Sequence, residues 1–122
     1  MVHQFMQTYK MNVFTKPTAS IGTDTHNLRY ELMKEENEEY LEAAQSSDVV
    51  EVADALGDML YILCGTILAH GMQDKIEEVF TEIQRSNMSK LGEDGQPVYR
   101  EDGKVLKGPN YSMPDLGRIL SE

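Results

Sequence analysis

Residues 35–40 read EENEEY and place four carboxylates within six positions of the chain. A helical stripe that begins at Leu28 and Leu32 continues into acidic residues when it is followed in steps of three or four. The acids on this stripe are Glu35, Glu36 and Glu39. Glu38 falls on another face and is predicted to be solvated. Carboxylates therefore occupy a helix face that begins as hydrophobic core.

A second group of carboxylates lies in the next apolar segment, within EVADALGDMLY. Asp54 and Asp58 are four residues apart and share one side of a helix. Asp58 has apolar neighbours in sequence, which is unfavourable for a carboxylate unless it is paired or bound to a cation. The break QSSD before this segment is short, so the two helices should be antiparallel. Glu36 and Glu39 then lie at the same level as the two aspartates.

Four carboxylates at one level would repel one another and raise each other's pKa values. A divalent cation relieves this repulsion, and an all-oxygen ligand set favours Mg²⁺, with Mn²⁺ as a substitute. The predicted metal ligands are Glu36, Glu39, Asp54 and Asp58. The alternative interpretation is that the acidic run is an ordinary solvated surface. A di-iron bundle is disfavoured because the Glu-x-x-His pairs that it needs are absent.

The chain has 122 residues, a length that suits one domain, and 40% of them are hydrophobic. Its formal net charge of −10 argues against nucleic acid and anionic membranes as partners. No apolar run approaches the roughly 20 residues of a membrane span, and the N-terminus lacks the apolar core of a signal peptide. The single Cys64 allows no intrachain disulfide. A cytoplasmic location is the resulting expectation.

Hydrophobic periodicity and turn residues predict four helices, one within residues 1–14 and three over about 25–44, 49–70 and 74–89. PVYR and KVLK flank EDG and could pair as a small hairpin, and Pro114 suits the first turn of a short last helix. The expected fold is an all-α bundle of about four helices in a single domain, 1–122. Residues 91–122 would form an irregular or hairpin tail that packs on it. Because so short a chain buries only roughly two-thirds of its unfolded surface, a homo-oligomer is expected.

EENEE followed by DALGDMLY resembles the all-α nucleoside triphosphate pyrophosphohydrolases, which include MazG, dimeric dUTPases, dCTP pyrophosphatases and phosphoribosyl-ATP pyrophosphohydrolase. The first motif matches their Glu-Glu-x-x-Glu signature. The tail, SNMSKL and YREDGKVLKGPNYSMPDL, resembles a MazG-like, phosphoribosyl-ATP pyrophosphohydrolase-like branch. One position departs from the pattern, because Ala55 stands where the Glu of Glu-x-x-Asp falls. Asp54 with Asp58 is the favoured pair, and Glu51 with Asp54 is the alternative.

The resemblance implies Mg²⁺-dependent hydrolysis of a (deoxy)nucleoside triphosphate to the monophosphate and pyrophosphate, by a homo-oligomer that is a dimer or a tetramer. The acids above would form the catalytic centre, with Glu35 as the candidate acceptor of the proton of the attacking water. Candidate substrate-binding residues are Arg29, Tyr61, Asn87, Lys90, Lys107, Asn110 and Tyr111. The alternatives are a phosphoribosyl-ATP pyrophosphohydrolase, an inactive metal- or nucleotide-binding homologue, which Ala55 favours, and a purely structural helical dimer.

Overall fold

The computed structural model describes all 122 residues and is all-helical, which confirms the predicted fold class. The chain divides into two compact units, Met1–Gln73 and Asp74–Glu122. Each unit is described by itself below. The prediction of one domain on which the tail packs stays a prediction.

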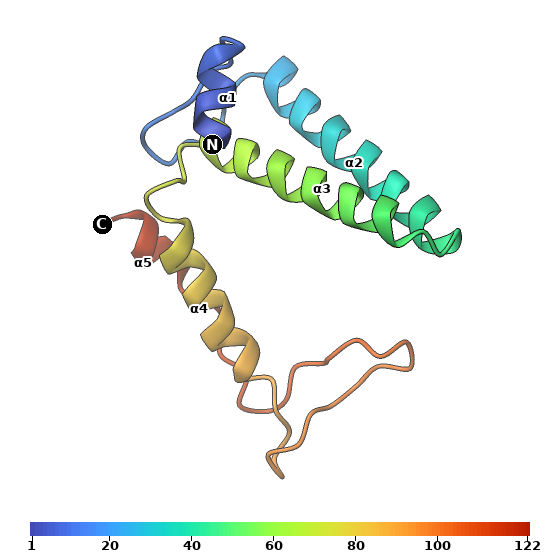
Figure 1. The fold of residues 1–122 in the computed structure, drawn as a ribbon. Coiled ribbons are helices and arrows are strands. Elements are labelled where there is room, and N and C mark those ends of the chain that lie inside the picture. The colour runs from blue at the N-terminus through green and yellow to red at the C-terminus, as the bar shows by residue number, and fades with distance from the viewer. The chain divides into compact units, whose positions relative to one another are not determined.

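The first unit is built on two long helices, α2 (Thr23–Gln45) and α3 (Val49–Ala69), which run antiparallel side by side (Figure 1). The predicted break between them is only three residues long. It ends in Asp48, whose carboxylate accepts hydrogen bonds from the backbone N–H groups of Val50 and Glu51, both at 3.1 Å. These N–H groups have no partner within the helix, so the aspartate fixes where α3 begins. The tight connection sets the register of the two helices.

A short helix, α1 (Val2–Thr8), packs against α3 (Figure 1). A small core of Met6, Ile21, Leu68 and Ala69 joins them. The connection that follows α1, residues 9–22, contacts the end of α3. Thr18 and His70 exchange two hydrogen bonds of 2.8 Å there. Gly71 ends α3 in the left-handed region, with φ of 68°, and a Cβ there would lie 2.1 Å from the Lys16 carbonyl oxygen. The helix therefore ends at Gly71 as predicted, and both the positive φ and the close Lys16 carbonyl favour glycine at this position.

α3 corrects one expectation from the sequence, that no apolar run approaches membrane-spanning length. By length and composition this helix could cross a membrane, with a mean hydropathy of 1.6 over its most apolar window. The central helix of a bundle has the same properties, and α3 packs against both α1 and α2. Its apolar surface is only partly covered, since 22% of that window is buried.

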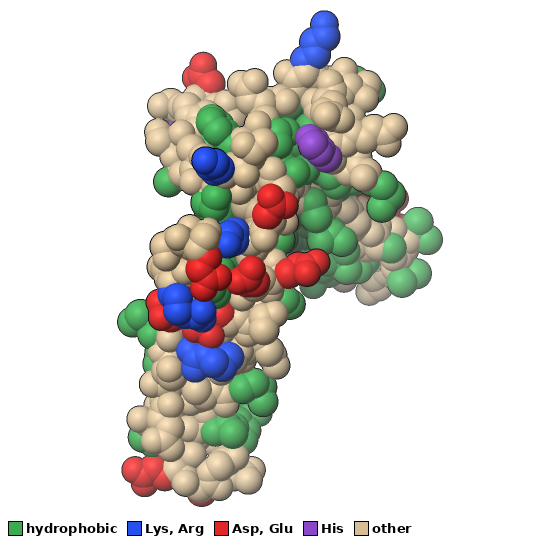
Figure 2. All heavy atoms as spheres, turned by 90° about the vertical axis from the view of Figure 1, so that its left-hand side faces the viewer, with side chains coloured by type: hydrophobic (Ala, Val, Ile, Leu, Met, Phe, Trp, Pro, Cys, Tyr) green, Lys and Arg blue, Asp and Glu red, His purple; other side chains and the backbone are tan.

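The second unit consists of α4 (Ile76–Met88), a long polar connection and α5 (Leu116–Leu120), which packs beside α4 (Figure 1). The predicted hairpin is reduced to one antiparallel bridge between Tyr99 and Val105, closed by a turn in which the Arg100 carbonyl accepts from Gly103 N–H. Two short arms with no third strand cannot extend the ladder further. Over α4 and α5, acidic and basic side chains intermingle on the surface (Figure 2).

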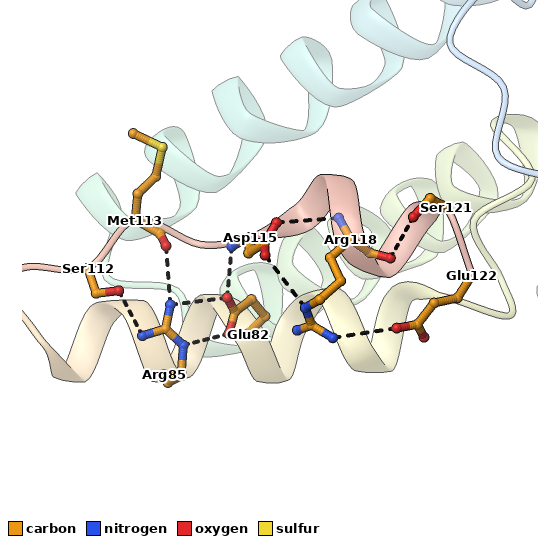
Figure 3. A network of polar contacts seen from close by, with 8 residues as sticks. All are labelled: Glu82, Arg85, Ser112, Met113, Asp115, Arg118, Ser121 and Glu122. Atoms are coloured by element: carbon orange, nitrogen blue, oxygen red, sulfur yellow. Dashed lines mark hydrogen bonds and ion pairs between the residues drawn. The ribbon is translucent and has the colours of Figure 1, made fainter.

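A buried carboxylate, Glu82, joins α4 to the end of the chain (Figure 3). It accepts from Arg85 Nε at 2.6 Å and from the backbone N–H of Asp115 at 2.7 Å. Arg85 also donates to Ser112 Oγ and to the Met113 carbonyl. These bonds hold the segment before α5 against α4. The hydrogen bond from Arg85, then that from Asp115, lowers the pKa of Glu82 from 4.5 to about 2.

Replacing Glu82 by Gln should lower the melting temperature at pH 7 by several degrees, because it removes the charge that both donors address. The native pKa lies below the unfolded one. The stabilisation is therefore complete above about pH 4.5 and is lost as the pH falls toward 2. Thermal melts across pH 2–7 should show the difference between parent and variant shrinking in acid. Glu78→Gln is the control, since Glu78 is exposed on the same helix. Equal melting at pH 7 would refute the role of Glu82.

Candidate active site

Three carboxylates meet on the facing sides of α2 and α3. Glu36 and Glu39 lie one turn apart on α2, and Asp58 faces them from α3, so that one oxygen of each lies within 4.8 Å of the other two. The antiparallel hairpin brings them together because Glu36 and Asp58 each lie about ten residues from the connection. No salt bridge involves any of the three.

Glu36 is the central member of this acidic trio. Its Oε2 atom is buried and has no hydrogen-bond partner. Burial, followed by the adjacent Glu39 carboxylate and the charges of Asp58 and Asp54, raises the pKa of Glu36 from 4.5 to about 7. A buried acceptor without a donor is unfavourable, and here it also faces like charges. The site is therefore short of positive charge.

A hard divalent cation fits this donor set. The trio offers only carboxylate oxygens, which suit Mg²⁺ or Mn²⁺. One oxygen of the Glu36 carboxylate, Oε2, has no hydrogen-bond partner. No lysine or arginine neutralises the site through an ion pair, so a bound cation would supply the missing charge.

Asp54, the fourth predicted ligand, lies just outside the trio. Its charge acts on Glu36, but it is not among the oxygens that lie within 4.8 Å of one another. Asp54 and the reserve candidate Glu51 line a polar cavity of about 250 Å³, together with Glu39. Glu51 is not among the charges that act on Glu36. The geometry thus brings together Glu36, Glu39 and Asp58, with Asp54 as their neighbour.

Ala55 accounts for part of this cavity. It is 2% exposed and lines the cavity together with Ala43 of the facing helix. At this position the signature of the resembling family carries a glutamate, a longer side chain that would extend into the same space. Alanine leaves this space open. The nearest acid is Asp54, one position earlier in the chain. Glu35, the candidate proton acceptor, is exposed on α2.

Two of the predicted substrate-binding residues lie in the first unit with the trio. Arg29 is 7% exposed and donates to Thr66 Oγ1 at 3.0 Å and to the Ile62 carbonyl at 2.9 Å, and burial lowers its pKa. The ring of Tyr61 meets Phe5 edge-on, with centroids 5.4 Å apart. Phe5 was not predicted as a site residue, because its only sequence signal is an apolar position in a short amphipathic segment.

The other candidates lie in the second unit: Asn87, Lys90, Lys107, Asn110 and Tyr111. Lys107 places its ammonium 4.7 Å from the centre of the Tyr111 ring, a cation–π contact. The backbone carbonyl of Lys90 accepts from Gly108 N–H at 2.9 Å. The tail is thus folded back on the end of α4 close to these residues. Their role toward a substrate remains a prediction.

Comparison with known proteins gives one match to a family, that of phosphoribosyl-ATP pyrophosphohydrolase, over residues 2–87. No curated protein matches. Among solved structures, the chain is similar to a protein of Exiguobacterium sp. 255-15, whose assignment as an NTP pyrophosphohydrolase is provisional. The two are 26% identical, with 98% of this chain and 89% of that one covered and a TM-score of 0.48. The matched region contains all three trio residues, and the chain belongs to the phosphoribosyl-ATP pyrophosphohydrolase family.

Proposed function

We propose that the protein is a metal-dependent nucleoside triphosphate pyrophosphohydrolase that releases pyrophosphate and a nucleoside monophosphate. Membership of a pyrophosphohydrolase family supports the class of reaction. The observation that carries the metal dependence is the Glu36 carboxylate, which has a buried oxygen without a donor and lies beside the carboxylates of Glu39 and Asp58. A site so short of positive charge suits an anionic substrate that arrives with its cations.

Glu36, Glu39 and Asp58 would hold Mg²⁺ or Mn²⁺ at the α2–α3 face, with Asp54 beside them. A bound divalent ion supplies charge neutralisation for the phosphates and lowers the pKa of a coordinated water. The rigid hairpin keeps the three carboxylates at fixed separations. An acid outside this set accepts the proton of the attacking water, and Glu35 is the candidate.

The test is a panel of nucleoside triphosphates and phosphoribosyl-ATP, assayed for pyrophosphate with Mg²⁺, with Mn²⁺ and with a chelator. Pyrophosphate from a triphosphate, abolished by the chelator, is the expected result. Turnover of phosphoribosyl-ATP alone would favour the second candidate, to which the family name points. Metal or nucleotide binding without any turnover would indicate an inactive homologue, for which Ala55 is the motivating feature.

We further propose a homo-oligomer, a dimer or tetramer, in the cytoplasm. On α3, Leu56, Leu60 and Leu63 form one stripe and are 51%, 61% and 46% exposed. An apolar groove of about 500 Å³ beside them also includes Tyr30 of α2. Apolar surface of this extent on helices is typical of an interface, and a second copy would cover it.

Asp54→Asn and Glu51→Gln should have unequal effects on turnover. Asp54 adds its charge to that of the trio, so its loss should reduce kcat/KM by at least about tenfold, as expected for a group beside a metal. Glu51→Gln should stay within about twofold of the parent. Pyrophosphate release by both variants, at saturating Mg²⁺ and pH 8, measures this. The reverse order would assign the second-helix ligand to Glu51.

A further inference from the structure

A further cavity in the first unit, of about 210 Å³, lies between α1, α2 and α3. Its walls are hydrophobic and aromatic except for one buried cation. Its lining includes Phe5, Arg29, Tyr61 and Gly65. The volume is smaller than the roughly 300–1,000 Å³ that a whole drug-sized ligand occupies, so it suits one ring system rather than a complete nucleotide.

Arg29 has donors to spare in this cavity. A guanidinium carries five N–H groups and no acceptor, and Arg29 uses two of them, on Thr66 Oγ1 and the Ile62 carbonyl. It makes no salt bridge, although more than nine-tenths of it is buried. The two bonds fix its position against α3 and leave three N–H groups for a ligand with acceptor atoms.

Gly65 makes room for this guanidinium. A Cβ at position 65 would lie 2.5 Å from Arg29 Nη2, so any other residue would displace it. Glycine in the middle of a helix is unfavourable relative to alanine. The close approach of Arg29 to the backbone of α3 therefore depends on a residue that the helix alone would disfavour.

The cavity is in line with the acidic trio. Arg29 and Glu36 are seven residues apart on one face of α2, and Gly65 and Asp58 are seven apart on one face of α3. Seven residues correspond to two helical turns, or about 10 Å. A nucleoside with its phosphate chain can span this separation, with the phosphates at the carboxylates and the base in the cavity.

We propose that this cavity is the base-specificity pocket and that it selects 6-oxopurine nucleotides, in which O6 and N7 accept from Arg29. This inference rests on the proposed function. An arginine fork pairs with two adjacent acceptors such as O6 and N7 of guanine, whereas adenine presents an amino donor in place of O6. Phe5 and Tyr61 supply aromatic surface for the ring. A phosphate in the same cavity would lose its hydration to mostly apolar walls.

Inosine and adenosine test the pocket without metal or hydrolysis, because they share a sugar and differ on the edge that Arg29 would meet. Calorimetric titration of the full chain in a chelator should show inosine binding at least about tenfold more tightly than adenosine. Equal affinities, or no binding of inosine at millimolar concentration, would overturn the proposal.

Gly65→Ala and Gly57→Ala form a matched pair on α3. The first should displace the guanidinium, which can swing aside without unfolding the helix, and should reduce the inosine preference to about twofold or less. The second adds a Cβ that meets nothing within 4 Å and should keep the preference. Arg29→Lys, which retains the charge but not the fork, should also lose it. If Gly65→Ala or Arg29→Lys retains the full inosine preference, Arg29 does not select the base and its role is limited to its hydrogen bonds between α2 and α3.

The triphosphate panel separates this proposal from the proposed function. Hydrolysis of dGTP and dITP at least about tenfold faster than dATP, in kcat/KM, supports both. Hydrolysis of all three at equal efficiency would refute the proposed base specificity but support the proposed pyrophosphohydrolase activity. If the protein prefers inosine but hydrolyses no nucleotide, the proposed activity is refuted and the proposed base specificity is supported.

Discussion

Replacing Glu39 by Gln should lower kcat/KM for pyrophosphate release by about a thousandfold while the fold survives. The carboxamide keeps the shape of the side chain but removes one of the three anionic oxygens that lie within 4.8 Å of one another. The loss of a proposed metal ligand should weaken the charge stabilisation that the ion gives to the transition state. A thousandfold change corresponds to about 4 kcal/mol of transition-state stabilisation.

The measurement is a steady-state assay of pyrophosphate with saturating Mg²⁺, accompanied by a thermal melt that confirms folding. Glu38→Gln is the matched control. It is the neighbouring residue on the same helix, is exposed, and lies on another face, so kcat/KM should stay within about twofold. If Glu39→Gln retains more than about a tenth of the parental kcat/KM, Glu39 is not a metal ligand.

The largest expected effect on stability comes from Mg²⁺ or Mn²⁺. If the ion binds the folded trio and not the unfolded chain, as proposed, a concentration of one hundred times its dissociation constant should add about 2.7 kcal/mol to the free energy of unfolding. Protons compete with the metal for Glu36, whose pKa is about 7, so the increment should be larger at pH 8 than at pH 6.

A double variant, Glu39→Gln with Asp58→Asn, should reverse both parts of this behaviour. Without metal it should melt higher than the parent, because two of the carboxylates that raise the pKa of Glu36 are gone. With metal it should gain nothing. Glu31→Gln with Glu38→Gln removes the same number of charges from exposed positions and should keep the metal increment. If the double variant melts lower than the parent without metal and is still stabilised by metal, the acids form an ordinary solvated surface and not a metal site.

The level at which the acids meet could be read from the sequence. Residue spacing along a helix fixes which side chains share a face, and a three-residue connection forces two helices to be antiparallel. Positions equally far from that connection must then lie opposite one another. The meeting of Glu36 and Glu39 with Asp58 follows from these two regularities. The all-α fold class follows from the hydrophobic periodicity of the segments.

The same reasoning could not separate Asp54 from Asp58. Both lie on one side of α3, and their distance to the facing carboxylates depends on how closely the helices pack. Near Asp54 two small buried residues on opposite helices, Ala43 and Ala55, line a cavity. The sequence pattern shows that they are small, but only the folded hairpin shows which acid falls inside the trio.

Arg29 shows the clearest difference between the two kinds of information. Its sequence signal is a cation near the start of the acidic helix, which made it a candidate substrate-binding residue. The tertiary structure buries it against Gly65, because α1, far from α3 in sequence, covers that end of the hairpin. The sequence by itself determined the helices, the shared faces and the acids. The depth of each side chain depends on contacts between segments distant in the chain, which local periodicity does not encode, so only the tertiary structure decided the cavity and its buried cation.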